Sequence, residues 1–331
     1  MEIDIKEVSN LIKKIKVSKN LYSMISSRYS DIGKWLNREN STIKQYNPII
    51  YPQGSVRIGT LIKPIAKSSY DVDLVCELSK NISIADCSAY QLKEKIGCEI
   101  KLYQNHKNIR GEIVESKRCW TLNYFEEVPF HIDILPAISY KNFTEIPNVI
   151  AITDNTFKNY KNITNEWILS NPIEYSNWFN KIDMDMLERS NKSKKLFDLL
   201  PIPKFIEDDS IFKVILMMIK RHRDIFFNNF EEIKTPSILI TTLACIAYKN
   251  TKTPTSLKTL SPYWMLPVIS NHLEIFANKS GEYIVKNPNS NSENFADKIN
   301  LNDDMKKGFK DWTKQLNKDV LKDYFFLKLD K

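Results

Sequence analysis

The sequence predicts an α+β protein in which a small mixed β-sheet is followed by a helical lobe. Apolar residues recur at helical spacing in the first 36 residues, short β-prone runs occupy residues 49–135, and helical patterns return from about residue 165. A chain of 331 residues can form one large domain or two tightly packed ones. We therefore expect a core of residues 1–165, which includes the N-terminal helices, and a helical lobe of residues 166–331, with a ligand cleft between them.

The first two elements are predicted to be amphipathic helices. Apolar residues recur every three or four positions in both, at Ile5, Val8, Leu11, Ile12 and Ile15 in the first and at Tyr22, Ile25, Tyr29, Ile32 and Leu36 in the second. This spacing gathers each set on one helical face. Pro48 and Pro52 then end the helical pattern.

The strands and the later helices follow in separate blocks. The β-prone runs cover residues 49–51, 72–75, 119–122 and 132–135, with a helix expected at about residues 85–103. Later helices are expected at residues 173–187, 211–227, 237–248, 262–276 and 303–329. The polar run KNPNSNSEN at residues 286–294 is expected to form a loop.

The composition is that of a globular protein with a basic balance. Hydrophobic residues make up 42% and charged residues 27% of the chain, and 48 Lys and Arg outnumber 40 Asp and Glu. The net charge of +8 fits an anionic ligand, either a nucleotide or a nucleic acid, and fits a lysine-rich solubility surface equally well. With 7 glycines, the chain contains neither a P-loop nor a dinucleotide-binding fingerprint.

The cysteines and the chain start indicate a cytoplasmic protein. Five widely spaced cysteines, an odd number without a CxxC pair, argue against a disulfide framework or a zinc ribbon, and we expect free thiols. The N-terminus has no apolar signal core, and no stretch approaches the ~18 apolar residues of a membrane span. We therefore expect a reducing compartment and no membrane contact.

Asp71 and Asp73 are the first candidate site residues. They flank Val72 on a strand-like run, so the period of two places both carboxylates on one face of the strand. Two neighbouring carboxylates repel each other, and a divalent cation such as Mg²⁺ removes the repulsion. The same motif also occurs by chance on exposed strand edges.

A glycine turn and a third acid extend this pattern. Gly54 and Ser55 follow a short apolar run, where backbone N–H groups and the Ser55 hydroxyl can hold phosphate oxygens, or where they form a plain turn. Asp133 lies in an apolar run that requires a partner for its charge, either a basic side chain or a metal shared with the first two acids. His131, on the same side of that strand, is interpreted as a structural or supporting residue.

These elements together predict a two-metal site for phosphoryl transfer. One metal would activate an attacking hydroxyl and the other would hold a nucleoside triphosphate and its leaving pyrophosphate. The acids would position both ions, and Asp133 would also lie near the attacking 3′ or 2′ oxygen as a proton acceptor.

The motifs resemble those of polymerase-β-type nucleotidyltransferases, and within them the bacterial cGAS/DncV-like nucleotidyltransferases (CD-NTases). The resemblance extends over residues 45–300 and is carried by QGS at 53–55 with GT at 59–60, DVDLV at 71–75, HIDILPA at 131–137, KRHRD at 220–224, PSILITTLA at 236–244, and NP at 287–288 with ENF at 293–295. It implies a polymerase-β-like catalytic core packed against a helical lobe that completes the nucleotide site.

The resemblance also implies the reaction. Such an enzyme joins nucleoside triphosphates (ATP, GTP or both, with UTP as an alternative) into a cyclic di- or trinucleotide and releases pyrophosphate. The product activates a partner effector in bacterial anti-phage defence of the CBASS type, and an operon-encoded regulator is a further expected partner. Two Mg²⁺ ions, replaceable by Mn²⁺, are expected on Asp71, Asp73 and Asp133. Without a zinc ribbon, direct DNA binding is not implied.

The remaining site residues follow from the same match. Gly54 and Ser55, with Gln53, are expected to hold the triphosphate, and Lys220 and Ser237 to reach its phosphates from the helical lobe. The alternatives are a solvated charged face for Lys220 and a helix cap for Ser237.

Two further positions have more than one interpretation from the sequence. Arg57 shares the loop with Ser55 and is expected either to contact the acceptor nucleotide or to brace an acid. Ile238 stands where relatives often carry a base-stacking aromatic residue, which leaves Tyr51 and Tyr248 as candidates.

Two other functions remain open from the sequence. An RNA- or tRNA-directed nucleotidyltransferase would keep the site and change the acceptor, and the charge of +8 is compatible with it. A catalytically silent relative in a toxin–antitoxin or scaffold role has no reason to keep three acids together.

Overall fold

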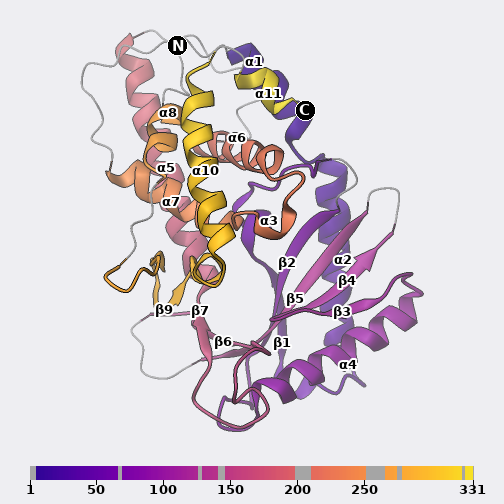
Figure 1. Cartoon of the computed structure of the whole chain (residues 1–331). Helices are drawn as coiled ribbons and strands as arrows, with labels where there is room; N and C mark the ends of the chain where they lie inside the picture. The colour runs from indigo at the N-terminus through magenta and orange to yellow at the C-terminus, as the bar shows by residue number, and fades with distance from the viewer. Residues whose placement is uncertain are drawn as a thin grey trace.

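The computed structural model describes residues 5–65, 69–125, 129–140, 146–197, 210–250, 265–273, 278–322 and 325–330. Its fold is α+β, as the sequence predicts, with a mixed sheet and a group of C-terminal helices. In Figure 1, helices α2 and α4 lie beside the sheet at the lower right, and the C-terminal helices gather at the upper left.

The main sheet has seven strands in the described part of the chain. They are β1 (Pro48–Pro52), β2 (Tyr70–Leu78), β3 (Ile113–Glu115), β4 (Trp120–Tyr124), β5 (Phe130–Ser139), β6 (Ile150–Ile152) and β7 (Ile168–Ser170). The order is β1-β2-β5-β4-β3, with β6 paired to β5 and β7 to β6, and the central pair β2–β5 is parallel whereas the others are antiparallel.

The four predicted strand runs correspond to β1, β2, β4 and β5. The strands that the sequence did not predict, β3, β6 and β7, have three residues each. Three residues are too few to give a periodic signal, so these strands depend on pairing with longer neighbours.

One face of the sheet packs against α2 (Lys19–Leu36) and α4 (Ala89–Lys107). Ser88 is the N-cap of α4 and forms a capping box with Gln91. The Ser88 hydroxyl accepts a hydrogen bond from the Gln91 backbone N–H, and the Gln91 side chain accepts one from the Ser88 backbone N–H. Even-numbered residues of the two central strands fill this core, including Val72 and Ile132, both fully buried. Odd-numbered residues, among them the acids, therefore lie on the opposite face.

The C-terminal helices form a second core. They are α5 (Pro172–Phe197), α6 (Ile211–Phe226), α7 (Ser237–Asn250), α8 (Met265–Asn271), α9 (Asp297–Asn300), α10 (Asp303–Val320) and α11 (Phe325–Leu329), with the short 3₁₀ turn Glu231–Ile233. Helix α6 is buried almost throughout. The imidazole of its His222 lies 3.1 Å from the Asp319 carboxylate of α10, and Lys328 of α11 contacts the same carboxylate. These polar contacts join three helices inside an apolar core.

Helix α1 (Ile5–Ile15) belongs to this second core. Its residues Val8, Leu11, Ile12 and Ile15 are buried among side chains of the C-terminal helices. The first helix of the chain thus packs with the lobe that the sequence assigns to residues 166–331. The division at residue 165 stays a prediction.

Two expected elements differ in detail. The polar run 286–294 forms a two-stranded hairpin of β8 (Lys286–Asn287) and β9 (Ser290–Asn294) rather than a loop, because a two-residue connection lets its ends pair. The expected helix at 303–329 is two helices, α10 and α11. Residues 262–264 and 274–276 of another expected helix lie outside the described residues.

All five cysteines are free. In the described part of the chain, no helix has the length and apolar character needed to cross a bilayer.

Packing of α4 on the sheet gives a first test. A Cβ built on Gly97 would lie 2.4 Å from the Trp120 ring, whose indole N–H donates to the Lys93 carbonyl at 2.8 Å. We expect Gly97→Ala to lower the free energy of unfolding by about 1–3 kcal/mol in urea denaturation, because neither partner can move freely.

Gly33 in α2 is the matched control, since its nearest neighbour would be 3.9 Å from an added Cβ. Gly33→Ala should stabilise the protein by roughly 0.5–1 kcal/mol through helix propensity. Equal effects of the two substitutions would contradict the described packing of α4.

Candidate active site

The register of β2 and β5 brings the candidate acids together. In this parallel pair Asp73 lies opposite Asp133, and Asp71 lies opposite His131. Val72 and Ile132 between them are fully buried on the other face. The alternation expected from the sequence is thus present on both strands, and it puts four ionisable side chains on one face of the sheet.

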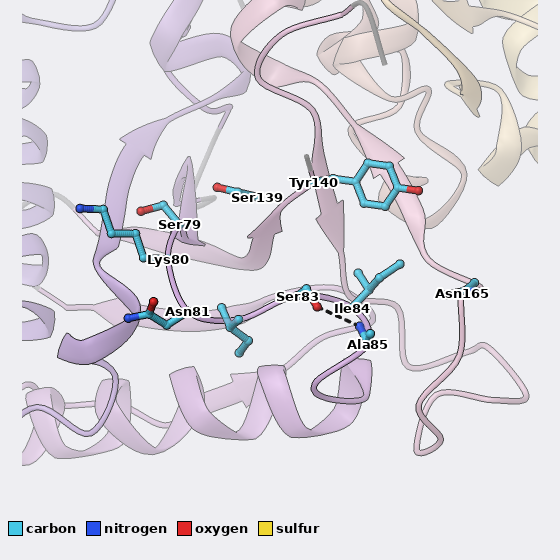
Figure 2. A pocket seen from close by; sticks show the side chains of 10 residues that line it. Ser79, Lys80, Asn81, Ser83, Ile84, Ala85, Ser139, Tyr140 and Asn165 are labelled. Carbon is cyan, nitrogen blue, oxygen red and sulfur yellow. Dashed lines mark hydrogen bonds between the residues drawn. The ribbon is translucent and has the colours of Figure 1, made fainter. Parts of the chain in front are cut away.

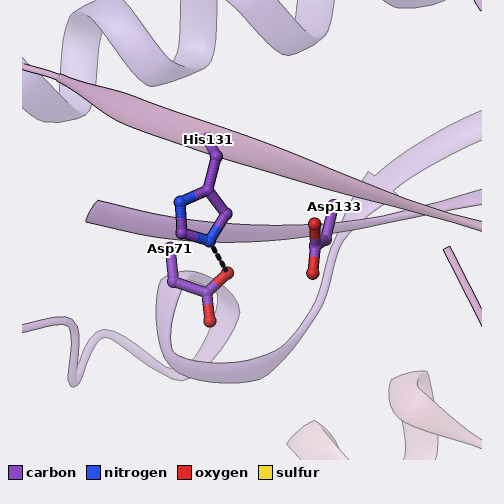
Figure 3. A group of neighbouring side chains, drawn as sticks. All are labelled: Asp71, His131 and Asp133. Carbon is purple, nitrogen blue, oxygen red and sulfur yellow. Dashed lines mark ion pairs between the residues drawn. The ribbon is translucent and has the colours of Figure 1, made fainter. Parts of the chain in front are cut away.

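His131 contacts Asp71 directly. Its Nε2 lies 3.2 Å from Asp71 Oδ1, and its Nδ1 lies 2.8 Å from the Ser69 hydroxyl. Figure 3 shows the imidazole directed at the Asp71 carboxylate, with Asp133 beside the pair. Ligand atoms of Asp71, His131 and Asp133 lie within 4.8 Å of one another, a spacing that a single cation can bridge.

Thr121 is a contact that the motifs did not identify. It lies opposite Asp133 on β4, and its hydroxyl donates to Asp133 Oδ1. This bond fixes one carboxylate oxygen and leaves Oδ2 for another ligand. The sequence could not identify this contact, because it depends on the register of β4 against β5 and no spacing in the sequence pairs residues 121 and 133.

Two of the acids, Asp73 and Asp133, lie in an environment that disfavours their charge. Burial, followed by repulsion from Asp71 and Asp133, raises the pKa of Asp73 well above its ordinary value. Burial also raises the pKa of Asp133, while the hydrogen bond to Asp71 raises the pKa of His131. A bound cation would reverse the balance at the acids, because it stabilises their ionised forms.

The glycine turn lies directly against Asp73. Helix α3 (Gly54–Ile58) begins there, and the Gln53 N–H donates to the Asp73 carbonyl at 2.9 Å. Gly54 has a φ of +56°, and a Cβ at this position would lie 2.6 Å from Asp73 Oδ2. Glycine is thus required both by the backbone conformation and by the close approach of the acid.

Lys220 lies beneath the same turn. The side chain is buried, and its Nζ donates to the Thr60 hydroxyl at 2.7 Å, just after the turn. Burial and the nearby Arg223 lower the pKa of Lys220 to about 7, whereas the charge of Asp73 acts in the opposite direction. The lysine therefore lies close to the acids, in contact with the turn rather than on a solvated face.

Ser237 and Arg57 have partners within the protein. The Ser237 hydroxyl, at the start of α7, accepts a hydrogen bond from Arg223 Nη1 at 2.7 Å. Arg57 donates to the Ser176 hydroxyl of α5 at 2.7 Å, and so links the turn to the C-terminal helices. Its partner is a serine rather than the acid that the sequence had suggested as one alternative, and contact with an acceptor nucleotide stays a prediction.

The two aromatic candidates for base stacking are both buried. The Tyr51 hydroxyl donates to Glu77 at 2.9 Å and the Tyr248 hydroxyl to Asp185 at 2.9 Å. These contacts engage the tyrosines inside the protein.

A pocket of about 340 Å³ lies elsewhere, at the carboxyl ends of β2 and β5, and Figure 2 shows it lined by Ser79, Lys80 and Tyr140 among others.

Comparison with known families identifies the chain. Residues 1–183, more than half of its length, match the Second Messenger Oligonucleotide or Dinucleotide Synthetase (SMODS) domain. The chain belongs to this family. It is a nucleotidyltransferase of the CD-NTase group, as the resemblance of its motifs had implied.

Similar proteins and structures agree with this assignment. A c-di-GMP synthase of Roseivirga ehrenbergii is 27% identical over 296 residues, which cover 88% of this chain and 71% of that protein. The structure of the Bradyrhizobium diazoefficiens CD-NTase CdnG in complex with GTP superposes with a TM-score of 0.68 at 18% identity and covers 96% of this chain and 91% of the other. Vibrio cholerae DncV superposes at 0.60 with 14% identity, covering 97% and 92%. These structures support the same fold.

The contact between Gly54 and Asp73 gives a second test. Gly54→Ala should lower the free energy of unfolding by about 1–3 kcal/mol more than Gly281→Ala, because Gly281 shares the positive φ but has no atom within 4 Å of the added Cβ. Guanidinium denaturation of both variants measures the difference.

The additional loss of unfolding free energy caused by Gly54→Ala should largely disappear when the substitution is made together with Asp73→Ala, because the clashing oxygen is then removed. Additive effects of the two substitutions would show that the turn at residue 54 does not contact the Asp73 carboxylate.

Proposed function

We propose that this enzyme joins nucleoside triphosphates into a cyclic di- or trinucleotide and releases pyrophosphate at each step. The observation that carries the proposal is the cluster of Asp71, Asp73 and Asp133 on one sheet face, directly beside the turn at Gly54. The c-di-GMP synthase and the cyclic dinucleotide synthase among its relatives support a cyclic product.

The donor set fits divalent cations. Three carboxylates supply hard oxygen ligands, and the raised pKa of Asp73 reflects a buried acid whose neighbours are also acids. We propose two Mg²⁺ ions, held by Asp71, Asp73 and Asp133, for which Mn²⁺ can substitute. When bound, they would lower the pKa of the attacking hydroxyl and neutralise the leaving pyrophosphate.

The chain's own residues would orient the reactants. The N–H groups and hydroxyl at Gly54 and Ser55 would hold the triphosphate, with Lys220 bracing the turn through Thr60. Asp133, fixed by Thr121 at one oxygen, would accept the proton of the attacking 3′ or 2′ hydroxyl at the other. His131 would keep the Asp71 carboxylate in one orientation.

We propose ATP, GTP or both as substrates; one similar structure, of CdnG, holds GTP, and one of DncV holds ATP and GTP. The cyclic product would activate an effector in anti-phage signalling of the CBASS type.

Product analysis tests the reaction. Wild type incubated with the four nucleoside triphosphates and Mg²⁺ should yield a phosphatase-resistant product with the mass of a cyclic di- or trinucleotide. Asp71→Asn and Asp73→Asn should each lower the rate at least about 100-fold, because each removes a charged ligand from the transition state.

Asp311→Asn, an exposed acid of α10, is the matched control and should keep the wild-type rate. Linear products only, or extension of added RNA in place of cyclisation, would refute the cyclase assignment and favour an RNA-directed enzyme.

A further inference from the structure

The imidazole of His131 lies among the acids of the proposed cation site. His131 is opposite Asp71 in the β2–β5 pair, and its Nε2 is 3.2 Å from Asp71 Oδ1. Asp133 follows two residues later on the same strand and therefore lies on the same face. The three side chains offer one nitrogen and two carboxylate oxygens within 4.8 Å of one another (Figure 3).

These spacings are close to those of ligands around one divalent cation. In an octahedral shell with bonds of about 2.1 Å, adjacent ligands lie about 3 Å apart and opposite ligands about 4.2 Å apart. The 3.2 Å between His131 Nε2 and Asp71 Oδ1 is near the first value. The 4.8 Å that encloses all three ligand atoms is near the second, so small side-chain rotations suffice for one ion to bind them all.

Two hydroxyl groups hold these side chains from behind. The Ser69 hydroxyl is 2.8 Å from His131 Nδ1, and the Thr121 hydroxyl donates to Asp133 Oδ1 at 2.5 Å. A metal-binding histidine almost always donates its other ring N–H to an oxygen, which fixes the orientation of the ring. Ser69 provides this oxygen, and Nε2 is then the nitrogen that is directed at Asp71.

The hydrogen bond between His131 and Asp71 uses the same two atoms that a cation would bind. In the free protein the Nε2–H donates to the Asp71 carboxylate, which can only accept. A cation bound by both atoms displaces this proton to solvent, while the Nδ1–H donates to Ser69. An ion can reach the pair, because 26% of the His131 side chain and 60% of the Asp71 side chain are exposed.

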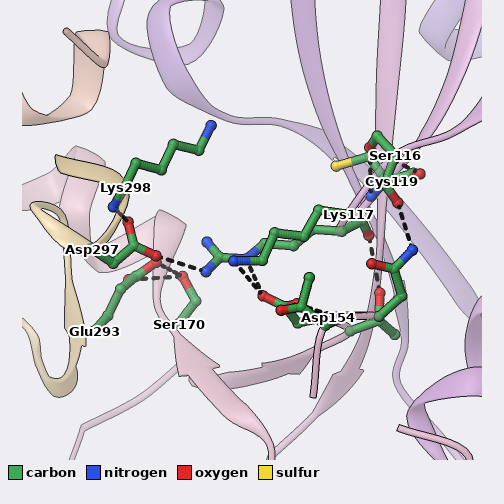
Figure 4. Close-up of polar contacts among 12 residues, drawn as sticks. Ser116, Lys117, Cys119, Asp154, Ser170, Glu293, Asp297 and Lys298 are labelled. Carbon is green, nitrogen blue, oxygen red and sulfur yellow. Dashed lines mark hydrogen bonds and ion pairs between the residues drawn. The ribbon is translucent and has the colours of Figure 1, made fainter. Parts of the chain in front are cut away.

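Another group of acids is balanced by a basic side chain instead. Arg118 donates to Asp154 from Nε at 3.0 Å and to Asp297 from Nη2 at 3.0 Å, as Figure 4 shows. Among the described residues, no lysine or arginine nitrogen lies within 4.0 Å of the carboxylates of Asp71 and Asp133. An arginine therefore neutralises the first group, whereas the second offers its oxygens, together with an imidazole, to a cation.

We propose that His131 is a nitrogen ligand of the cation shared by Asp71 and Asp133, and that this position prefers first-row transition ions such as Mn²⁺ to Mg²⁺. The proposal rests on the proposed function, since it assigns a ligand and a metal preference to the same site. Mg²⁺ favours oxygen ligands, whereas imidazole binds transition ions well. The nitrogen therefore adds affinity for Mn²⁺ that it does not add for Mg²⁺.

Electron spin-echo spectroscopy of bound Mn²⁺ tests the coordination directly, without nucleotide or turnover. Wild type with one equivalent of Mn²⁺ should show the nitrogen modulation of a directly bound imidazole. His131→Gln should abolish it, because a glutamine side chain binds a cation through oxygen. His272→Gln, the same substitution at an exposed histidine outside the cluster, is the matched control and should keep the modulation.

Isothermal titration calorimetry with Mn²⁺ and with Mg²⁺ measures the metal preference. His131→Gln should weaken the Kd for Mn²⁺ at least about tenfold and the Kd for Mg²⁺ less than about twofold. Ser69→Ala removes the hydrogen-bond partner of Nδ1 and should weaken Mn²⁺ binding about tenfold while the imidazole stays bound. An equal loss for both ions in His131→Gln would show that the histidine acts only by holding Asp71.

The spectroscopic result and the reaction can fail independently. No nitrogen modulation in wild type, or modulation that persists in His131→Gln, would overturn the ligand assignment. A cyclic product from wild type that shows no modulation would overturn this inference and keep the proposed function. Modulation without a cyclic product in either metal would refute the proposed function and leave His131 as a ligand.

Discussion

Mutual repulsion among three carboxylates is the constraint on which the site depends. The parallel register of β2 and β5 fixes Asp73 opposite Asp133, with Asp71 two residues earlier on the same face. The apolar side chains between them are buried under α2 and α4, so the strands cannot turn to separate the acids. The charge must instead be balanced by what binds there.

The surrounding contacts hold the acids in place and leave part of their oxygens available. Thr121 fixes one oxygen of Asp133, and His131 fixes one oxygen of Asp71. Gly54 allows the turn to approach Asp73 closely, and Lys220 supports the turn from the helical lobe. The two lobes are therefore connected at the site itself, which suits a reaction between two nucleotides.

Short-range patterns predicted the fold class, the four longer strands and the faces of Asp71 and Asp73. Three-residue strands and the hairpin at 286–294 escaped prediction, because their stability comes from pairing with distant segments. The same reason hid Thr121, whose partner Asp133 lies across a strand pair. Sequence spacing carries no information about such contacts.

Unfolding experiments on Asp73→Asn at neutral pH test whether the acids repel each other until a cation binds. Because the folded-state pKa of Asp73 is raised, its ionisation disfavours folding, and stability falls as the pH rises through that pKa. In EDTA the variant should therefore be more stable than wild type. Mg²⁺ at about 100 times its Kd should add about 2.7 kcal/mol to the free energy of unfolding of wild type and much less to that of the variant. Wild type should then be the more stable of the two. A variant that is less stable than wild type in EDTA and gains equally from Mg²⁺ would show that the acids do not repel each other in the free protein.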